Sequence, residues 1–207
     1  MADIIVIYIS AAADLALERE VLNRAITEIP TTLAWRIVET PLTHIEPDLD
    51  SVVAADIHLL LLGGDVRAPV GVEWAVARRA GRLPVLYLKN SVTHTQAAQA
   101  FIRELERYTE WHRYEHAGDL RIAVLKRLAD HILERREHYS LKDSEYTSLS
   151  DWRKQLRKSP RQKVDDTRGG AGNSSLILSL ERYMPSDGVL LNDPASENRN
   201  PASTDAD

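Results

Sequence analysis

Short aliphatic, β-branched runs alternate with helix-period segments from residue 3 to residue 139, and this alternation restricts the fold more than any other feature of the chain. Strands and helices in regular succession indicate a parallel sheet, because each helix returns the chain to the end at which the next strand must start. Five strands are expected, at residues 3–9, 33–39, 56–62, 83–89 and 110–116, the last of them a short, polar edge strand.

Helical periodicity fills the segments between these strands. Helices are expected at residues 14–29, 48–55, 71–81, 95–108 and 119–139. The predicted fold class is therefore α/β, with three layers and a doubly wound parallel sheet of about five strands in a flavodoxin-like order. We expect this domain to occupy residues 1–140.

Residues 141–207 differ in character and are expected to form a basic linker and a largely disordered tail with short helical segments. Basic residues concentrate at 152–163, residues 165–175 resemble a linker, and 174–191 form a small apolar island. The basic run suits a solvated helix face, or alternatively contact with phosphate or nucleic acid. The apolar island either packs back on the domain or docks a protein partner.

Composition narrows the function classes. The net charge of −5 argues against electrostatic binding of nucleic acid by the protein surface as a whole. The absence of cysteine excludes disulfides and thiolate metal sites. The apolar runs are too short for a signal peptide or a membrane span. We expect a soluble, cytoplasmic protein with no membrane partner.

In an open parallel sheet, ligands bind beyond the carboxyl ends of the strands, where the strand order reverses. Ser10 closes the first strand, and Gly63 and Gly64 close the third, so these residues are expected to line that crevice. Glycines allow backbone N–H groups to approach a ligand closely. The predicted ligand-binding residues are Ser10, Asp14, Gly63, Gly64 and Asp65. As alternatives, Asp14 suits an N-cap of the first helix and Ser10 a cap of the same turn.

Glu73 is expected to begin the helix that follows the glycine loop, which would bring its carboxylate to the same crevice. A half-buried carboxylate beside Trp74 would have a raised pKa or would stabilise a developing positive charge. Alternatively, Glu73 lies in a first helical turn and only complements the helix dipole.

Familiar cofactor motifs are missing from the sequence. The seven histidines show no metal-ligand spacing, and no phosphate-binding Gly-x-x-x-x-Gly-Lys loop or Gly-x-Gly-x-x-Gly fingerprint is present. No metal and no cofactor are therefore predicted.

Two blocks of the sequence resemble the DUF4062 domain family. "VIYISAAADLALERE" is similar to its opening, with Ser10, Asp14, Leu15, Glu18 and Arg19 at the matching places, and alanines where the family has a second Ser and a Thr. The segment from Ala54 to Leu88 is similar to its second block, with Asp56, Gly63 and Glu73 matching, although its loop is shorter and lacks Arg-Tyr-Gly. The resemblance covers residues 3–139.

This resemblance implies a relationship to TIR domains and nucleoside 2-deoxyribosyltransferases, in which a glutamate on the helix after a central strand acts at an N-glycosidic bond. It implies that Glu73 is the catalytic carboxylate and that NAD or a nucleoside is the substrate. Ser10 and the amides of Gly63 and Gly64 would fix the sugar or phosphate, and Asp14 or Asp65 would position water.

The function predicted from the sequence is thus a TIR-like nucleotide- or nucleoside-binding effector or signalling domain that cleaves an N-glycosidic bond. The alternative is a non-catalytic interaction module of a signalling or defence system. Such a module would associate with a second copy of the chain or dock a protein partner, for example through the tail.

Overall fold

A single parallel sheet forms the centre of the domain in a computed structural model that describes residues 4–42 and 46–156. Its strand order is β2-β1-β3-β4-β5, and every neighbouring pair is parallel. The strands are β1 (Ile4–Ala11), β2 (Ala34–Glu39), β3 (Ile57–Leu62), β4 (Val85–Lys89) and β5 (Trp111–Tyr114).

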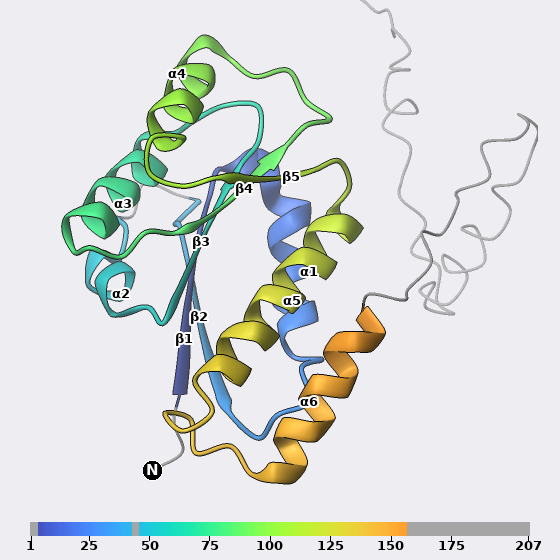
Figure 1. The fold of residues 1–207 in the computed structure, drawn as a ribbon. Coiled ribbons are helices and arrows are strands. Elements are labelled where there is room, and N and C mark those ends of the chain that lie inside the picture. The colour runs from blue at the N-terminus through green and yellow to red at the C-terminus, as the bar shows by residue number, and fades with distance from the viewer. Residues whose placement is uncertain (1–3, 43–45, 157–207) are drawn as a thin grey trace, which may run out of the picture. The chain divides into compact units, whose positions relative to one another are not determined.

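Helices cover both faces of this sheet, as Figure 1 shows, with α2, α3 and α4 on one face and α1, α5 and α6 on the other. They are α1 (Ala16–Ile26), which follows a 3₁₀ turn at Ala13–Leu15, α2 (Leu49–Ala54), α3 (Ala68–Arg79), α4 (Gln96–Leu105), α5 (Ala117–Glu134) and α6 (Asp143–Leu156). The predicted three-layer α/β class is confirmed, and the strand order is the flavodoxin-like one.

The two central strands explain why the sequence reads as continuous apolar runs. All six residues of β3 are buried, because helices cover both of its faces. Along β1, Ile5, Ile7 and Ile9 enter the large core cluster that also contains residues of α1 and α5. Tyr8 points to the other face, where it packs with Val52 of α2. Alternate residues of β1 therefore serve opposite layers.

Local capping fixes the ends of several helices. The Asp48 carboxylate accepts the Ser51 backbone N–H at 3.0 Å and starts α2. The Thr95 hydroxyl accepts the Ala98 N–H at 3.1 Å and starts α4 in the same way. Gly81 follows α3 with a φ of +71°, a left-handed conformation that glycine adopts without strain.

Helix α3 begins at Ala68, whereas the sequence suggested a start at Gly71. Pro69 lies in the first turn of α3, where a missing backbone N–H is tolerated, so the proline belongs to the helix instead of preceding it. Glu73 therefore does not begin the helix, and no acidic residue lies in its first turn. The helix-dipole interpretation of Glu73 loses its basis.

Helix α6 lies beyond residue 140, where the sequence analysis placed the end of the domain. It packs against α5, and its Leu149 side chain is fully buried in the same core cluster as Leu128 and Ile132 of α5. The domain thus includes at least residues up to Leu156. Residues 157–207, with most of the predicted basic run, the linker and the apolar island, lie outside the described residues.

Within residues 4–42 and 46–156, no helix combines the length and the apolar character needed to span a bilayer.

Candidate functional site

The Glu73 carboxylate is fully buried and is hydrogen-bonded by three hydroxyl groups. The Tyr8 hydroxyl donates to Oε1 at 2.7 Å. The hydroxyls of Ser10 and Thr40 donate to Oε2 at 2.6 Å and 2.7 Å. These distances fall in the range of about 2.5–2.7 Å that is typical of O–H donors to an ionised carboxylate.

Three elements bring these groups together. Tyr8 and Ser10 are two residues apart on β1, so both side chains point to the face covered by α3. Thr40 follows β2 directly; its N–H donates to the Ile9 carbonyl at 3.1 Å, and its hydroxyl accepts the Ala11 N–H at 3.2 Å. The hydroxyl oxygen of Thr40 therefore has a fixed place beside β1, from which its proton reaches Glu73.

His58 completes the arrangement from β3. It pairs in register with Tyr8, and its Nε2 lies 2.8 Å from the Ser10 hydroxyl oxygen. The Tyr8 and His58 rings pack edge to face, with their centroids 5.4 Å apart. We refer to Tyr8, Ser10, Thr40, His58 and Glu73 together as the Glu73 cluster.

Burial dominates the electrostatics of the Glu73 cluster. It raises the pKa of Glu73 above its ordinary value, although the hydrogen bonds from Ser10, Thr40 and Tyr8 and the charge of Arg19 act in the opposite direction. Burial also lowers the pKa of His58 to about 4, so that its imidazole is neutral at physiological pH. The pKa of Tyr8 is raised by burial and by the Glu73 carboxylate, which keeps the phenol protonated.

No cation forms an ion pair with Glu73 in the part of the chain that the structure describes. Arg19 acts from a distance: its guanidinium donates to Glu39 Oε2 and to the Thr40 carbonyl, each at 2.7 Å. Burying a carboxylate with hydroxyl partners alone is costly. Perturbed buried acids of this kind concentrate at functional sites, although structural networks also contain them.

Four of the predicted ligand-binding residues, which follow β1 and β3, form a second group. The Asp14 carboxylate accepts the Gly64 N–H at 2.9 Å, which ties the loop after β1 to the loop after β3. A Cβ on Gly63 would lie 2.4 Å from Asp14 Oδ2, so only glycine allows this contact without a shift of Asp14. The Asp65 carboxylate accepts the Thr95 hydroxyl at 2.6 Å.

Asp14 does not cap the first helix, so the alternative prediction for this residue is wrong. Leu15 occupies the N-cap position of α1, and Asp14 lies in the preceding 3₁₀ turn. Among the described residues, no hydrogen bond joins Asp14, Gly64 or Asp65 to Glu73. Of the six predicted site residues, the structure brings Ser10 to Glu73 and gathers the other four in the loops above the carboxyl edge.

Sequence reasoning missed Tyr8, Thr40 and His58. Polar groups at positions 8 and 10 of an otherwise apolar strand are a period-2 signal that points both residues to one face. Nothing in the sequence marked Thr40, because its role depends on the pairing of β2 with β1. The ion pair of Lys89 with the buried Glu18, at 2.7 Å on the α1 face of the sheet, was also unpredicted.

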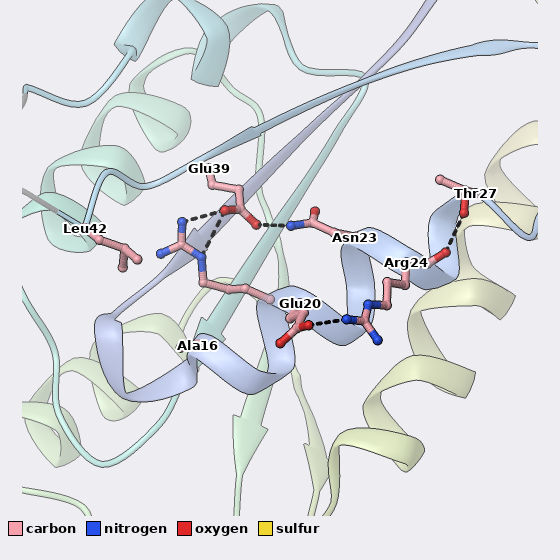
Figure 2. A pocket seen from close by; sticks show the side chains of 8 residues that line it. Ala16, Glu20, Asn23, Arg24, Thr27, Glu39 and Leu42 are labelled. Atoms are coloured by element: carbon pink, nitrogen blue, oxygen red, sulfur yellow. Dashed lines mark hydrogen bonds and ion pairs between the residues drawn. The ribbon is translucent and has the colours of Figure 1, made fainter. Parts of the chain in front are cut away.

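A shallow groove of about 560 Å³ lies along α1 and the end of β2 (Figure 2). Asn23 donates to Glu39 Oε1 at 3.0 Å across it, and Figure 2 shows Glu20 and Arg24 paired beside this bond. No member of the Glu73 cluster lines this groove. The groove borders the Glu73 cluster through Arg19, which lines it and donates to the Thr40 carbonyl, but the Glu73 carboxylate does not line it.

The described residues contain no group of three or more His, Asp or Glu side chains arranged to hold a metal ion. Comparisons with family models, with curated proteins and with solved structures gave no match for this chain. The resemblance to DUF4062 thus stays a prediction, and the site must be interpreted from its own chemistry.

Acid should destabilise the fold through its buried histidines. Burial lowers the pKa of His58 and of His131 from 6.5 to about 4, so the unfolded chain binds these protons at a higher pH than the folded chain. The stabilisation that comes from keeping these two imidazoles neutral is fully present above pH 6.5 and is lost as the pH drops towards 4. The contribution of His58 is at most about 3 kcal/mol.

Urea unfolding at pH 6.5 and pH 4.5 measures this effect. Glu73 opposes it, since its raised pKa lets the folded state take up that proton first. His131→Gln should reduce the pH dependence by removing one of the two imidazoles. The same pH dependence in wild type and in His131→Gln would contradict the burial of a neutral imidazole at His131.

Proposed function

We propose that this domain binds a nucleotide or nucleoside at the carboxyl edge of its sheet and cleaves the N-glycosidic bond, with Glu73 as the catalytic carboxylate. The observation that carries the proposal is the buried Glu73 carboxylate, held by hydroxyl groups from β1 and from the end of β2. It lies beside Ser10, next to the point where the strand order reverses between β1 and β3.

The chemistry of the reaction suits such a group. When the C1′–N bond breaks, the base leaves with the bonding electrons and C1′ gains oxocarbenium character. Water then forms the new C1′–O bond and loses one proton, which passes to the departing base of a nucleoside or, when nicotinamide leaves NAD as a neutral molecule, to the solvent. A fixed negative charge in a dry site stabilises the cationic transition state strongly, because little solvent screens it.

The hydroxyl partners of Glu73 also suggest how a sugar would be held. A ribose offers hydroxyl donors of the same kind as Ser10 and Thr40. Because Glu73 is fully buried, a sugar can reach it only by displacing part of this shell. Thr40 follows edge strand β2, so rotation of its side chain leaves the central strands in place and costs the bond that its hydroxyl accepts from the Ala11 N–H.

The resemblance to DUF4062, and through it to TIR domains and nucleoside 2-deoxyribosyltransferases, supports the same assignment for Glu73. In this proposal the loops with Asp14, Gly63, Gly64 and Asp65 contact the rest of the ligand. NAD or a nucleoside is the substrate, and neither a cofactor nor a membrane takes part. A cytoplasmic location and a protein partner that docks through the tail belong to the same proposal.

A second candidate function is a non-catalytic interaction module. Its supporting observation is that Glu73 has no exposed surface and that protein hydroxyls occupy both carboxylate oxygens. In that case Glu73 serves to attach α3 to β1 and β2, and the domain acts through its surface, by self-association or by docking a partner.

The deciding experiment incubates the purified chain with NAD and with a panel of purine and pyrimidine nucleosides, and measures the free base released. The proposal expects release of base from at least one substrate class at a rate proportional to enzyme concentration. Absence of release from every compound, by protein with a cooperative melting transition, would favour the interaction module.

A further inference from the structure

We propose that His58 is a positioning residue for Glu73, whose Nε2–H holds the Ser10 hydroxyl so that the Ser10 proton lies on the Glu73 carboxylate. The proposal deepens the function suggested above and rests on it for its catalytic meaning. Its structural content, the tautomer of His58 and its effect on Glu73, can be tested separately.

The single proton of the Ser10 hydroxyl determines this assignment. The Ser10 hydroxyl has one proton and two close neighbours, Glu73 Oε2 at 2.6 Å and His58 Nε2 at 2.8 Å. An ionised carboxylate only accepts hydrogen bonds, so the Ser10 proton must point to Glu73. The bond to His58 then requires a proton on Nε2, which makes the Nε2–H tautomer the one that fits.

The other partners of Glu73 support its ionised form. Tyr8 and Thr40 also donate to it, and both bonds are 2.7 Å long. The Thr40 oxygen accepts the Ala11 N–H at 3.2 Å, and the short 2.7 Å bond to Glu73 Oε2 takes its proton in preference to the Ile9 carbonyl at 3.5 Å. Three short donors directed at one carboxylate match an acceptor that has no proton of its own.

The surroundings of His58 fix its ring in this position. Its imidazole is 6% exposed and packs edge-on against the Tyr8 ring. Its Nδ1 is buried and has no hydrogen-bond partner within the described part of the chain. The ring is thus anchored through Nε2 alone, and the bond to Ser10 is the hydrogen bond that offsets the cost of burying this polar ring.

This order of groups differs from that of a nucleophilic triad. In a triad the histidine lies between the hydroxyl and the acid and removes the hydroxyl proton. Here Ser10 lies between His58 and Glu73, and its hydroxyl is fully buried. Ser10 is therefore a link that transmits the orientation set by His58, and His58 acts on Glu73 through it.

The first test is nitrogen NMR of the unliganded protein at pH 7, which distinguishes the two imidazole tautomers. The His58 ring should be neutral with its proton on Nε2. A proton on Nδ1 would overturn the proposal, because Ser10 would then have to donate to His58 and not to Glu73.

The second test follows the side-chain carboxyl carbon of Glu73 through a pH titration. His58→Leu removes the donor and frees the Ser10 hydroxyl, so the pKa of Glu73 should rise further, since the Ser10 bond lowers it. His58→Gln places an amide N–H near the former Nε2 and should restore the wild-type pKa. His131→Gln changes another buried histidine outside the Glu73 cluster and should have no effect.

An unchanged Glu73 pKa in a folded His58→Leu protein would contradict the positioning role. If that variant fails to fold, the tautomer measurement decides. Neither readout needs substrate, so absence of base release would count against the proposed function while leaving the role of His58 open to these measurements. In an active enzyme, His58→Leu should move the acid limb of the pH profile of kcat to higher pH, and His58→Gln should restore its wild-type position.

Discussion

Replacing Glu73 by glutamine should reduce base release by about a hundredfold or more while the fold stays intact. The amide is nearly isosteric with the carboxylate: its oxygen can accept the bonds of Ser10 and Thr40, and its nitrogen can donate to the Tyr8 hydroxyl oxygen, whose own proton then turns away. It lacks the negative charge that stabilises an oxocarbenium-like transition state. The fold should not suffer, because burial of the charge is unfavourable, as the raised pKa of Glu73 shows.

One melting curve and one base-release assay compare this variant with wild type. Glu104→Gln makes the same change of charge on α4, where Glu104 pairs with Arg107 at the surface, and serves as the matched control. The control should retain wild-type turnover. A stable Glu73→Gln protein that releases base at the wild-type rate would defeat the catalytic assignment.

Leu149→Ala should lower the free energy of unfolding by about 2–5 kcal/mol, the usual effect of truncating a fully buried leucine. Leu149 lies in α6, is fully buried, and belongs to the same core cluster as residues of α5. Removal of its side chain leaves a cavity between two helices that neither backbone can fill. Urea denaturation followed by circular dichroism gives the value.

Leu17→Ala provides the control on the same face of the sheet, because Leu17 in α1 is 62% exposed. It should change the free energy by less than about 0.5 kcal/mol. If Leu149→Ala behaved like Leu17→Ala, α6 would not belong to the cooperative core, and the domain would end near residue 140 as the composition suggested.

The layers of this fold could be predicted from sequence because their signals are local. A buried parallel strand requires an uninterrupted apolar run, and β1 and β3 have one each. Asp48 and Thr95 start helices by bonding to residues three positions ahead, which is also a local pattern. The start of α3 was wrong by three residues because residues 68–70 were assigned to the preceding loop, whereas proline fits a first helical turn.

Helix α6 was underestimated for a different reason. Its basic and acidic residues drew attention to charge, while Leu149, Trp152 and Leu156 recur at intervals of three and four, the period of a helix with one buried side. These three residues contact the large core cluster in the structure. The periodicity was present, but the composition of the segment obscured it.

The site could be predicted only as far as topology determines it. Strand order places Ser10 and the glycine loop at the same edge, and the structure adds Glu73 in contact with Ser10. The hydroxyl of Tyr8 reaches Glu73 across 65 residues of sequence, and that of Thr40 across 33. Such contacts depend on how deeply α3 lies on the sheet, which no local pattern encodes.

Carbon NMR of the Glu73 carboxylate during a ligand titration tests most directly whether this group meets a substrate. The resonance is identified by its loss in Glu73→Gln, and NAD or a nucleoside that releases base is added at low temperature to slow turnover. We expect the Glu73 signal to shift and to saturate with the ligand, as sugar hydroxyls replace those of the protein. A signal that stays fixed while calorimetry shows the ligand to be bound would contradict this expectation.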